Sequence, residues 1–271
     1  MNNEPLVSVI MATFNEPERF IKASINSILN QTYHNLELLI ADDSSKDETI
    51  RAIDECAASD NRVKVIRKVQ RMGFVNALNI ALKESKGTYI ARMDGDDVAV
   101  PERFEKQVAY LESHQEMDVL GGAMNIQNEK SEITSTRYYP SGGCKLLCWM
   151  SLRDPVGHPT VMFRRNIIDN GLYYDETMNK GCEDTELWFR LRNNGFKIAN
   201  LQEPLVNYRI TVDMATKRER DNNANYIARK KNFSWKYFFF DCLSLVAIKT
   251  RMLMPKKAIS WLYSKENHQK Y

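Results

Sequence analysis

Short apolar runs alternate with longer segments of helical periodicity in the first third of the chain. The runs Leu6–Ala12 and Leu36–Ala41 are continuous and rich in leucine or β-branched residues, which is typical of strands covered on both faces. Between them, Pro17–Gln31 repeats apolar residues at a spacing near 3.6, which predicts a helix with one buried side. The order is therefore strand, helix, strand.

The same alternation continues as far as Met93. Two further helices are expected at Ser45–Ala58 and Phe74–Glu84, and two further strands at Val63–Arg67 and Thr88–Met93. This order specifies a Rossmann-like, mostly parallel sheet with right-handed crossovers and helices on both faces. We therefore predict an α/β fold.

The rhythm changes after Pro101, where strands added antiparallel to the sheet are expected. A main domain is expected to close near Asp213, so that residues 1–213 form one domain and residues 214–271 a helical tail. The elements expected in this part of the main domain are helices at Pro101–His114 and Glu183–Asn194, and strands at Asp118–Gln127, Thr160–Arg164, Lys197–Leu201 and Leu205–Ile210.

Charge separates the tail from the rest of the chain. Residues 214–271 hold 13 Lys and Arg against 4 Asp and Glu, whereas residues 1–213 hold 25 against 31. Basic residues alternate there with the apolar clusters Trp235–Phe240, Leu243–Ile248 and Trp261–Tyr263, which are too short to span a bilayer. This pattern predicts a segment that lies on an anionic membrane surface. Packing on the main domain, or a dimer contact, is the alternative.

Cysteine usage and the first residues bear on the compartment. The five cysteines are scattered and odd in number, and the chain begins without a basic region followed by a long apolar one. We therefore expect a cytoplasmic protein with reduced thiols, and the pattern of the tail would make it peripheral on the inner face of the cell membrane.

Two acidic clusters follow predicted strands. Asp42–Asp43 ends the second strand, and Asp94–Asp97 ends the fourth. The carboxyl ends of parallel strands share one edge, where open α/β sheets bind ligands. Like charges this close repel, and Mg²⁺ or Mn²⁺ uses one or two carboxylates while phosphates complete its shell. The clusters thus predict a metal and a phosphate ester. Helix capping is the alternative, but one carboxylate would suffice for it.

The first strand-to-helix turn, Thr13–Glu16, contains no glycine, so neither a dinucleotide fingerprint nor a P-loop is present. Metal and side chains would then hold the phosphates. Arg67, Lys68 and Arg71 follow the third predicted strand and would meet phosphate charge at the same edge. For each of them singly, a solvated loop residue is an equally good interpretation.

A third acidic position lies in the segment GCEDTELWFRLRNNG. On a helix, Asp184 falls on the apolar stripe, whereas three other charged residues fall outside it, namely Glu183, Glu186 and Arg190. A carboxylate at a cavity wall can have a raised pKa and act as a general base, and a helix N-terminal acid is the alternative. His158, before Pro159 and a predicted strand, would line the acceptor or diphosphate side, or serve as a hydrogen-bonded structural histidine.

Taken together, these segments resemble the inverting family 2 glycosyltransferases of GT-A fold that build bacterial surface polysaccharides. The resemblance covers about Leu6 to Ile210, and residues 1–213 would be the catalytic domain. The motifs that carry it are VSVIMATFNE (Val7–Glu16), QTYHNLELLIADDSSKDET (Gln31–Thr49), GFVNALNIALKESKGTYIARMDGDD (Gly73–Asp97), GHPTVMFRR (Gly157–Arg165) and CEDTELWFRL (Cys182–Leu191).

The resemblance implies a role for each of several residues. Thr13 and Asp42 would contact the nucleotide base, and Asp94 the ribose side. Asp96 would hold Mg²⁺ or Mn²⁺, and Asp184 would deprotonate the acceptor hydroxyl. The donor would be a nucleotide diphosphate-sugar, with UDP favoured, and the acceptor a glycan or lipid-linked glycan. The expected nucleotide-sugar site is completed by Asn15, Glu16, Arg71, Gly95 and His158.

Two departures and several rivals qualify this assignment. Relatives often have Asp-Asp-Gly-Ser where this chain has Asp42–Ser45, and the Gln-x-x-Arg-Trp motif of processive polymerases is absent, which predicts one sugar per encounter. A sugar-nucleotide pyrophosphorylase would need a glycine-rich, basic first loop. A non-catalytic nucleotide-sugar-binding protein would not need the full acidic set, and the acidic body disfavours nucleic acid as a partner.

Overall fold

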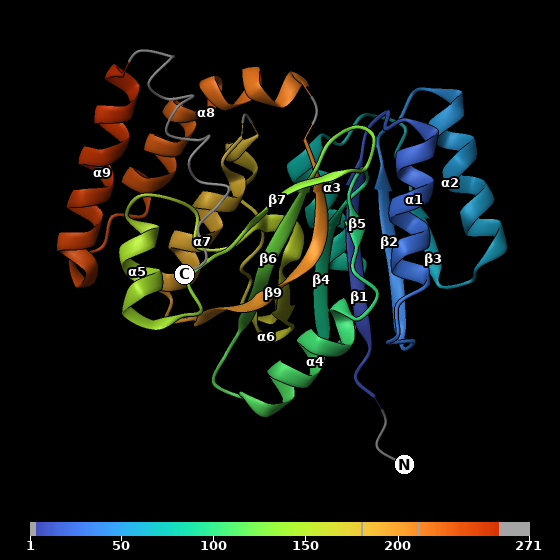
Figure 1. The fold of residues 1–271 in the computed structure, drawn as a ribbon, viewed down its shortest axis with the longest axis horizontal. Coiled ribbons are helices and arrows are strands. Elements are labelled where there is room, and N and C mark those ends of the chain that lie inside the picture. Colours follow the sequence, from blue (N-terminus) through green and yellow to red (C-terminus); the bar gives the residue numbers. More distant parts are fainter. Residues whose placement is uncertain (1–3, 180, 211, 255–271) are drawn as a thin grey trace.

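The structure is a computed structural model that describes residues 4–179, 181–210 and 212–254. One nine-stranded sheet runs through it, with helices packed on its faces (Figure 1). The strands are β1 (Val7–Thr13), β2 (Leu36–Asp42), β3 (Val63–Ile66), β4 (Tyr89–Asp94), β5 (Val98–Ala99), β6 (Val119–Gln127), β7 (Ile133–Arg137), β8 (Met162–Arg164) and β9 (Ile198–Arg209). The helices are α1 (Glu18–Leu29), α2 (Asp47–Ser59), α3 (Phe74–Glu84), α4 (Arg103–Ser113), α5 (Gly143–Met150), α6 (Asn166–Asp169), α7 (Glu183–Asn193), α8 (Val212–Lys231) and α9 (Phe238–Leu253).

The first half of the sheet confirms the predicted alternation. Strands β3, β2, β1 and β4 lie side by side in that order, and every pairing among them is parallel. Helices α1, α2 and α3 provide the crossovers. The carboxyl ends of β1, β2 and β4 therefore meet at one edge, as the sequence predicts.

The second half agrees only in part with the expected antiparallel additions. Strand β8 is antiparallel to both β4 and β6, and β7 is antiparallel to β6. Strand β6, however, pairs with β9 in parallel, a direction that the sequence pattern does not indicate. The two strands expected at 197–201 and 205–210 are the single strand β9, whose register shifts near Pro204. In the sequence, Pro204 suggests a break between two strands, whereas in the structure it marks an irregular register within one strand.

Alternation along β1 divides the core into two layers. Val7, Val9 and Met11 face one layer, which α1, α2 and α4 cover, and Ile10 and Ala12 face the other, which α3 and α7 cover. Successive strand residues point to opposite faces, so a continuous apolar run fits a strand covered on both sides. This explains why the unbroken runs in the sequence indicated buried strands correctly.

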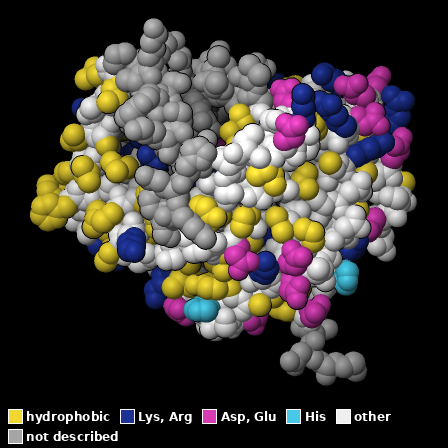
Figure 2. Space-filling model, in the orientation of Figure 1, with side chains coloured by type: hydrophobic (Ala, Val, Ile, Leu, Met, Phe, Trp, Pro, Cys, Tyr) yellow, Lys and Arg dark blue, Asp and Glu magenta, His cyan; other side chains and the backbone are white. Residues whose placement is uncertain are grey.

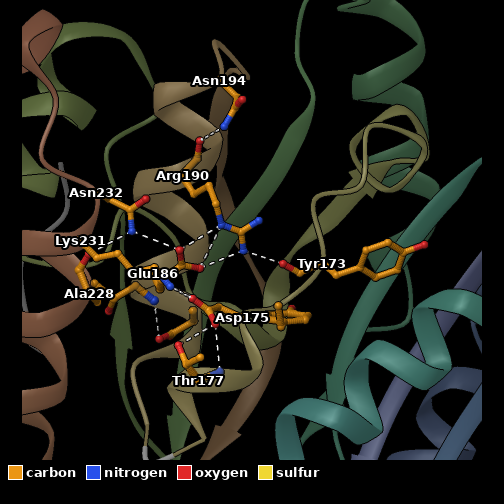
Figure 3. A network of polar contacts seen from close by, with 12 residues as sticks. Tyr173, Asp175, Thr177, Glu186, Arg190, Asn194, Ala228, Lys231 and Asn232 are labelled. Carbon is orange, nitrogen blue, oxygen red and sulfur yellow. Dashed lines mark hydrogen bonds and ion pairs between the residues drawn. The ribbon is translucent and has the colours of Figure 1, made fainter.

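Helix α8 is anchored on α7 by a buried glutamate (Figure 3). The Glu186 carboxylate accepts hydrogen bonds from Arg190 Nε at 3.0 Å and from Asn232 Nδ2, directly after α8, at 3.2 Å. Arg190 also donates to the carbonyl of Tyr173 at 2.5 Å. The sequence places Glu186 outside the buried side of α7, and this is wrong because α8 covers that side.

Helix α9 is joined to α7 by an ion pair that is almost fully buried. Arg192 Nη1 lies 2.7 Å from Asp241 Oδ1, and Nη2 lies 2.9 Å from Oδ2. Asp241 also accepts a hydrogen bond from the backbone N–H of Ser234 at 2.9 Å. Described residues of the predicted tail thus pack on the main domain. The tail cluster Trp261–Tyr263 and Lys256–Lys257 lie outside the described residues.

The structure also bears on the cysteines and on the length of the apolar segments. None of the five cysteines, all of which lie in the described part of the chain, forms a disulfide. Among the described helices, none combines the length and apolar character needed to cross a membrane.

Asp241→Asn should lower the free energy of unfolding by about 3–5 kcal/mol, because it leaves the Arg192 guanidinium buried without a counter-charge. Urea denaturation followed by tryptophan fluorescence measures this loss. The control is Lys106→Met, which breaks the exposed Lys106–Glu203 pair and should cost about 1 kcal/mol or less. Equal losses in the two variants would contradict a stabilising role for the buried pair.

Candidate active site

Three predicted site residues are neighbours at the carboxyl edge of the sheet. In the strand register, Thr13 of β1 pairs with Asp42 of β2, and Ala12 pairs with Asp94 of β4. Adjacent strands lie about 4.8 Å apart, so the three side chains share one small region. The Thr13 hydroxyl is buried and has no hydrogen-bond partner among the described residues. A buried polar group of this kind is suited to meet a ligand.

The two aspartates that end β2 have different contacts. Asp42 is buried and accepts hydrogen bonds from Arg67 Nε at 2.7 Å and from the Ser44 N–H at 2.9 Å. Asp43 accepts from the N–H groups of Met72 and Gly73 at 2.8 and 2.6 Å, and so holds the loop before α3. Arg67, considered for phosphate, is thus already paired with Asp42.

The sequence interpretation missed a buried arginine on β4. The side chain of Arg92 is 4% exposed, and its guanidinium forms an ion pair with both carboxylate oxygens of Asp94. Arg92 lies inside the run that the sequence indicates as an oily strand, and its two-residue spacing from Asp94 puts both on one face of β4. The chain itself therefore supplies part of the positive charge that compensates the acidic cluster.

A second buried arginine, Arg209 at the end of β9, compensates the rest of this cluster. Its backbone N–H donates to Asp97 Oδ1 at 2.7 Å, and its side-chain Nε donates to the carbonyl of Asp96 at 2.9 Å. Asp97 is fully buried, and its other carboxylate oxygen has no partner within the described chain. Burial, with the nearby Asp94 charge, raises the pKa of Asp96 to about 6 and that of Asp97 well above its usual range.

The first strand-to-helix turn lies directly beside this acidic loop. A Cβ on Gly95 would come within 3.1 Å of the Thr13 hydroxyl and 3.2 Å of Glu16 Cγ, so these three residues converge. Asn15 has a left-handed backbone, with φ of 59°. Its side-chain oxygen accepts from the N–H groups of Ser45 and Lys46 at 2.8 and 2.9 Å, which ties the first loop to the second.

Arg71 is the outermost of the predicted binding residues. Its guanidinium lies over the ring of Phe14, 3.8 Å from the centroid, and 4.0 Å from the Asp43 carboxylate. The side chain remains largely exposed. It is thus a cation at the rim of the strand-end site.

Asp184 begins a separate wall of the site at the start of α7. It faces a cavity of about 410 Å³ that is also lined by Glu183, Asp154 and Trp149, and by Arg229 and other residues of the C-terminal helices. Burial, with the charges of Asp154 and Glu183, raises the pKa of Asp184 well above its usual range. Cys182, the residue directly before α7, has a left-handed backbone with φ of 63°, a strained conformation of the kind found at functional sites.

His158 lies behind this wall. Its Nε2 is 2.7 Å from the Tyr174 hydroxyl, and its ring packs edge-on against Trp188. Burial and the Arg92 charge hold its pKa well below the usual range, so the imidazole is neutral. Its Nδ1 lies 4.0 Å from Glu183. Trp188 is fully buried, as its place on the apolar stripe of α7 indicates.

Arg92 connects the two walls electrostatically. It pairs with Asp94 at the strand edge, and its charge also favours the ionised forms of Glu183 and Asp184. The strand-end acids and the α7 acids are therefore near enough for one guanidinium to act on the charges of both.

The carboxylates can be tested against the metal that the sequence predicts. Within residues 4–179, 181–210 and 212–254, no group of three Asp, Glu, His or Cys side chains could hold an ion unaided. A divalent ion that uses one or two carboxylates and ligand phosphates does not need such a group. Asp96, with its raised pKa and no direct cationic partner for its carboxylate in the described residues, fits this kind of site.

Comparison with known proteins decides the family. The profile described as "Glycosyl transferase family 2" matches residues 8–171. The chain belongs to this family. The putative glycosyltransferase EpsE of Bacillus subtilis (strain 168) is 38% identical over 220 residues, covering 80% of this chain and 78% of EpsE. The O-antigen biosynthesis glycosyltransferase WbnJ of Escherichia coli is 35% identical over 209 residues, covering 76% of this chain and 80% of WbnJ.

Solved structures confirm the GT-A fold of this family 2 glycosyltransferase. The S. aureus TarS 1–349 structure in complex with UDP has a TM-score of 0.69 at 20% identity, over 93% of this chain and 73% of that one. The mannosyltransferase PcManGT from Pyrobaculum calidifontis, in complex with GDP-Man and Mn²⁺, has a TM-score of 0.67 at 15% identity, over 97% and 81%.

Arg92→Met should lower the free energy of unfolding of this glycosyltransferase by about 3–5 kcal/mol near neutral pH, because it leaves buried carboxylates without their counter-charge. In the variant, the pKa values of those carboxyls are higher in the folded than in the unfolded state, so protonation stabilises the folded state. The loss of unfolding free energy should therefore become smaller between about pH 7.5 and about pH 5. Urea unfolding at both pH values measures this.

Arg62→Met is the matched control, since Arg62 pairs with Asp60 at 2.8 Å in a partly exposed position away from the site. Its loss should be about 1 kcal/mol or less. A loss in Arg92→Met no larger than this would overturn the role assigned to Arg92.

Proposed function

We propose that the protein is an inverting glycosyltransferase that moves one sugar from a nucleotide diphosphate-sugar to a hydroxyl of a glycan or lipid-linked glycan. The observation that carries the proposal is the position of Asp184. It is a carboxylate of raised pKa at the wall of a cavity, and Arg92 links it to the acidic strand ends. Donor binding is thus assigned to the strand-end wall, and removal of the acceptor proton to the adjacent wall at the start of α7.

The donor is assigned to the strand-end wall. Thr13 and Asp42 would contact the base, Asp94 the ribose side, and Asn15, Glu16 and Gly95 would form the turn beneath the nucleotide. The unpartnered Thr13 hydroxyl supports this placement. Arg71, exposed at the rim, would meet the diphosphate, and the TarS complex with UDP supports a uridine nucleotide. His158, hydrogen-bonded to Tyr174 behind the wall that carries Asp184, would lie on the acceptor or diphosphate side.

Asp96 is assigned as the residue that holds Mg²⁺ or Mn²⁺. The Mn²⁺ in the PcManGT complex and the raised pKa of Asp96 support this assignment. When bound, a divalent ion neutralises charge on the leaving diphosphate. Asp94 pairs with Arg92, and one carboxylate oxygen of Asp97 accepts the backbone N–H of Arg209, which leaves Asp96 as the acid of this loop for the ion.

Asp184 is assigned as the general base. The acceptor hydroxyl would lie in the cavity, where Asp184 removes its proton as the oxygen attacks the anomeric carbon from the side opposite the diphosphate. Burial and the charges of Asp154 and Glu183 raise the pKa of Asp184, which makes it a stronger base than an ordinary aspartate. Attack from the opposite side inverts the anomeric configuration.

The acceptor is assigned to the same cavity. Trp149 and Tyr138 on its wall would stack on sugar rings, and the cavity is large enough for a small part of a glycan. The names of relatives in O-antigen biosynthesis support a bacterial surface polysaccharide as the product. A lipid-linked acceptor would place the reaction at the cytoplasmic face of the membrane.

Asp96→Ala should reduce sugar transfer by about 10²-fold or more while the fold remains intact, because the variant loses the charge that holds the cation. Screening a panel of UDP- and GDP-sugars for hydrolysis and for thermal stabilisation, with and without Mn²⁺, measures both effects. Asp169→Ala, an exposed acid at the end of α6, is the control and should behave as wild type. Full activity in EDTA, or in Asp96→Ala, would refute the metal assignment.

Asp184→Asn should keep donor affinity within a few-fold but lower turnover by about 10²-fold or more, the usual scale of general-base catalysis. Wild-type turnover should fall as pH decreases through the raised pKa of Asp184, because the protonated acid cannot accept a proton, and the variant should lack this limb. Steady-state kinetics across pH and donor titrations test this. Normal transfer by Asp184→Asn would return Asp184 to a structural role at the start of α7.

A further inference from the structure

Helix α9 has its polar side turned inward. Three of its residues, Asp241, Ser244 and Ile248, are buried against the domain, and two of these are polar. Asp241 is paired with Arg192, and the Ser244 hydroxyl accepts a hydrogen bond from Arg229 Nη1 at 2.5 Å. The helix is therefore held to the domain through polar contacts.

The opposite side of α9 is apolar and exposed. We define its outward face as Phe239, Leu243, Val246 and Leu253, which recur at helical spacing and are 84, 52, 61 and 86% exposed. Figure 2 shows hydrophobic side chains gathered at the edge of the molecule where Figure 1 places α9. In water, an amphipathic helix buries its apolar side. The inverted arrangement of α9 indicates that its outward face meets a non-aqueous environment.

Aromatic and basic residues extend the outward face at the start of the helix. Trp235 is 80% exposed and stacks on Phe238 with ring centroids 5.4 Å apart. Lys236, which lies between these two residues in the sequence, is exposed, as is Lys249 towards the other end of α9. Tryptophan and lysine beside aliphatic residues are typical of helices that lie in the headgroup region of a bilayer.

We propose that the outward face of α9 binds the surface of an anionic lipid bilayer. The apolar side chains would enter the headgroup boundary while the lysines meet lipid phosphates. A second copy of the chain fits less well, because a symmetric contact between two such faces would bring the lysines of both copies together.

This face belongs to the same pair of helices that complete the cavity beside Asp184. Helix α8 supplies Asn222, Asn225 and Arg229 to the cavity wall, and α9 supplies Arg251. Docking of α9 would therefore bring the acceptor cavity to the lipid surface. This last step rests on the proposed function, and it names the acceptor as one anchored in the bilayer to which α9 binds.

The test is co-sedimentation of the full chain with vesicles of phosphatidylcholine and phosphatidylglycerol at low salt. Wild type should bind, and vesicles of phosphatidylcholine alone should retain less of it. The triple variant Phe239→Ser, Leu243→Ser, Val246→Ser should lower the partition coefficient about tenfold or more, because it removes the apolar side chains that enter the bilayer. The control is Val69→Ser with Ile133→Ser, which alters two exposed apolar residues outside α9 and should leave binding unchanged.

Circular dichroism and nucleotide-sugar hydrolysis without lipid show whether the triple variant is folded and active, so a failure of docking is distinguishable from a failure of the catalytic assignment. Equal vesicle binding by wild type and the triple variant would overturn the proposal, as would wild type that stays in the supernatant. A concentration-dependent dimer in sedimentation velocity that the triple variant loses, without vesicle binding by wild type, would assign the face to a second copy instead.

Discussion

A single buried guanidinium determines how acids can gather on both sides of this site. Arg92 stands on a central strand, is enclosed by protein, and pairs directly with Asp94. Without it, the carboxylates at the end of β4 and those at the start of α7 would repel one another in a medium of low polarity. Burial, with a contribution from this charge, also holds the pKa of His158 well below its usual range. The acids on both sides of the site therefore depend on this one charge.

Completion of the site by distant parts of the chain is a second constraint. Strand β9 carries Arg209 back to the loop after β4, where it binds Asp96 and Asp97. Helices α8 and α9 contribute to the cavity that faces Asp184, and they are fixed to α7 through Glu186 and through the Arg192–Asp241 pair. The expected boundary near Asp213 falls where α8 begins, and the residues that follow it form part of the cavity wall.

Local sequence patterns predicted the parts of the structure that local forces determine. Continuous apolar runs identified β1, β2 and β4, and the acids that follow them lie at one edge of the sheet, as the sequence predicts. The parts that were missed depend on contacts distant in sequence. Arg92 looked like one polar residue in an oily strand, because its partners Asp94 and the α7 acids act on it only in the folded chain. Glu186 looked exposed because nothing in α7 itself shows that α8 covers it. Strand β9 looked interrupted because Pro204 sits where its register with β6 shifts.

The contacts of Asn15 and Asp43 have a consequence for how quickly a ligand binds. Asn15 joins the loop after β1 to the loop after β2, and Asp43 joins the loop after β2 to the loop before α3. Three consecutive loops therefore form one connected rim before any ligand arrives. A ligand that enters this edge need not order the loops, so little conformational entropy is lost on binding. Association would then be limited by encounter and orientation instead of by a slow closing motion.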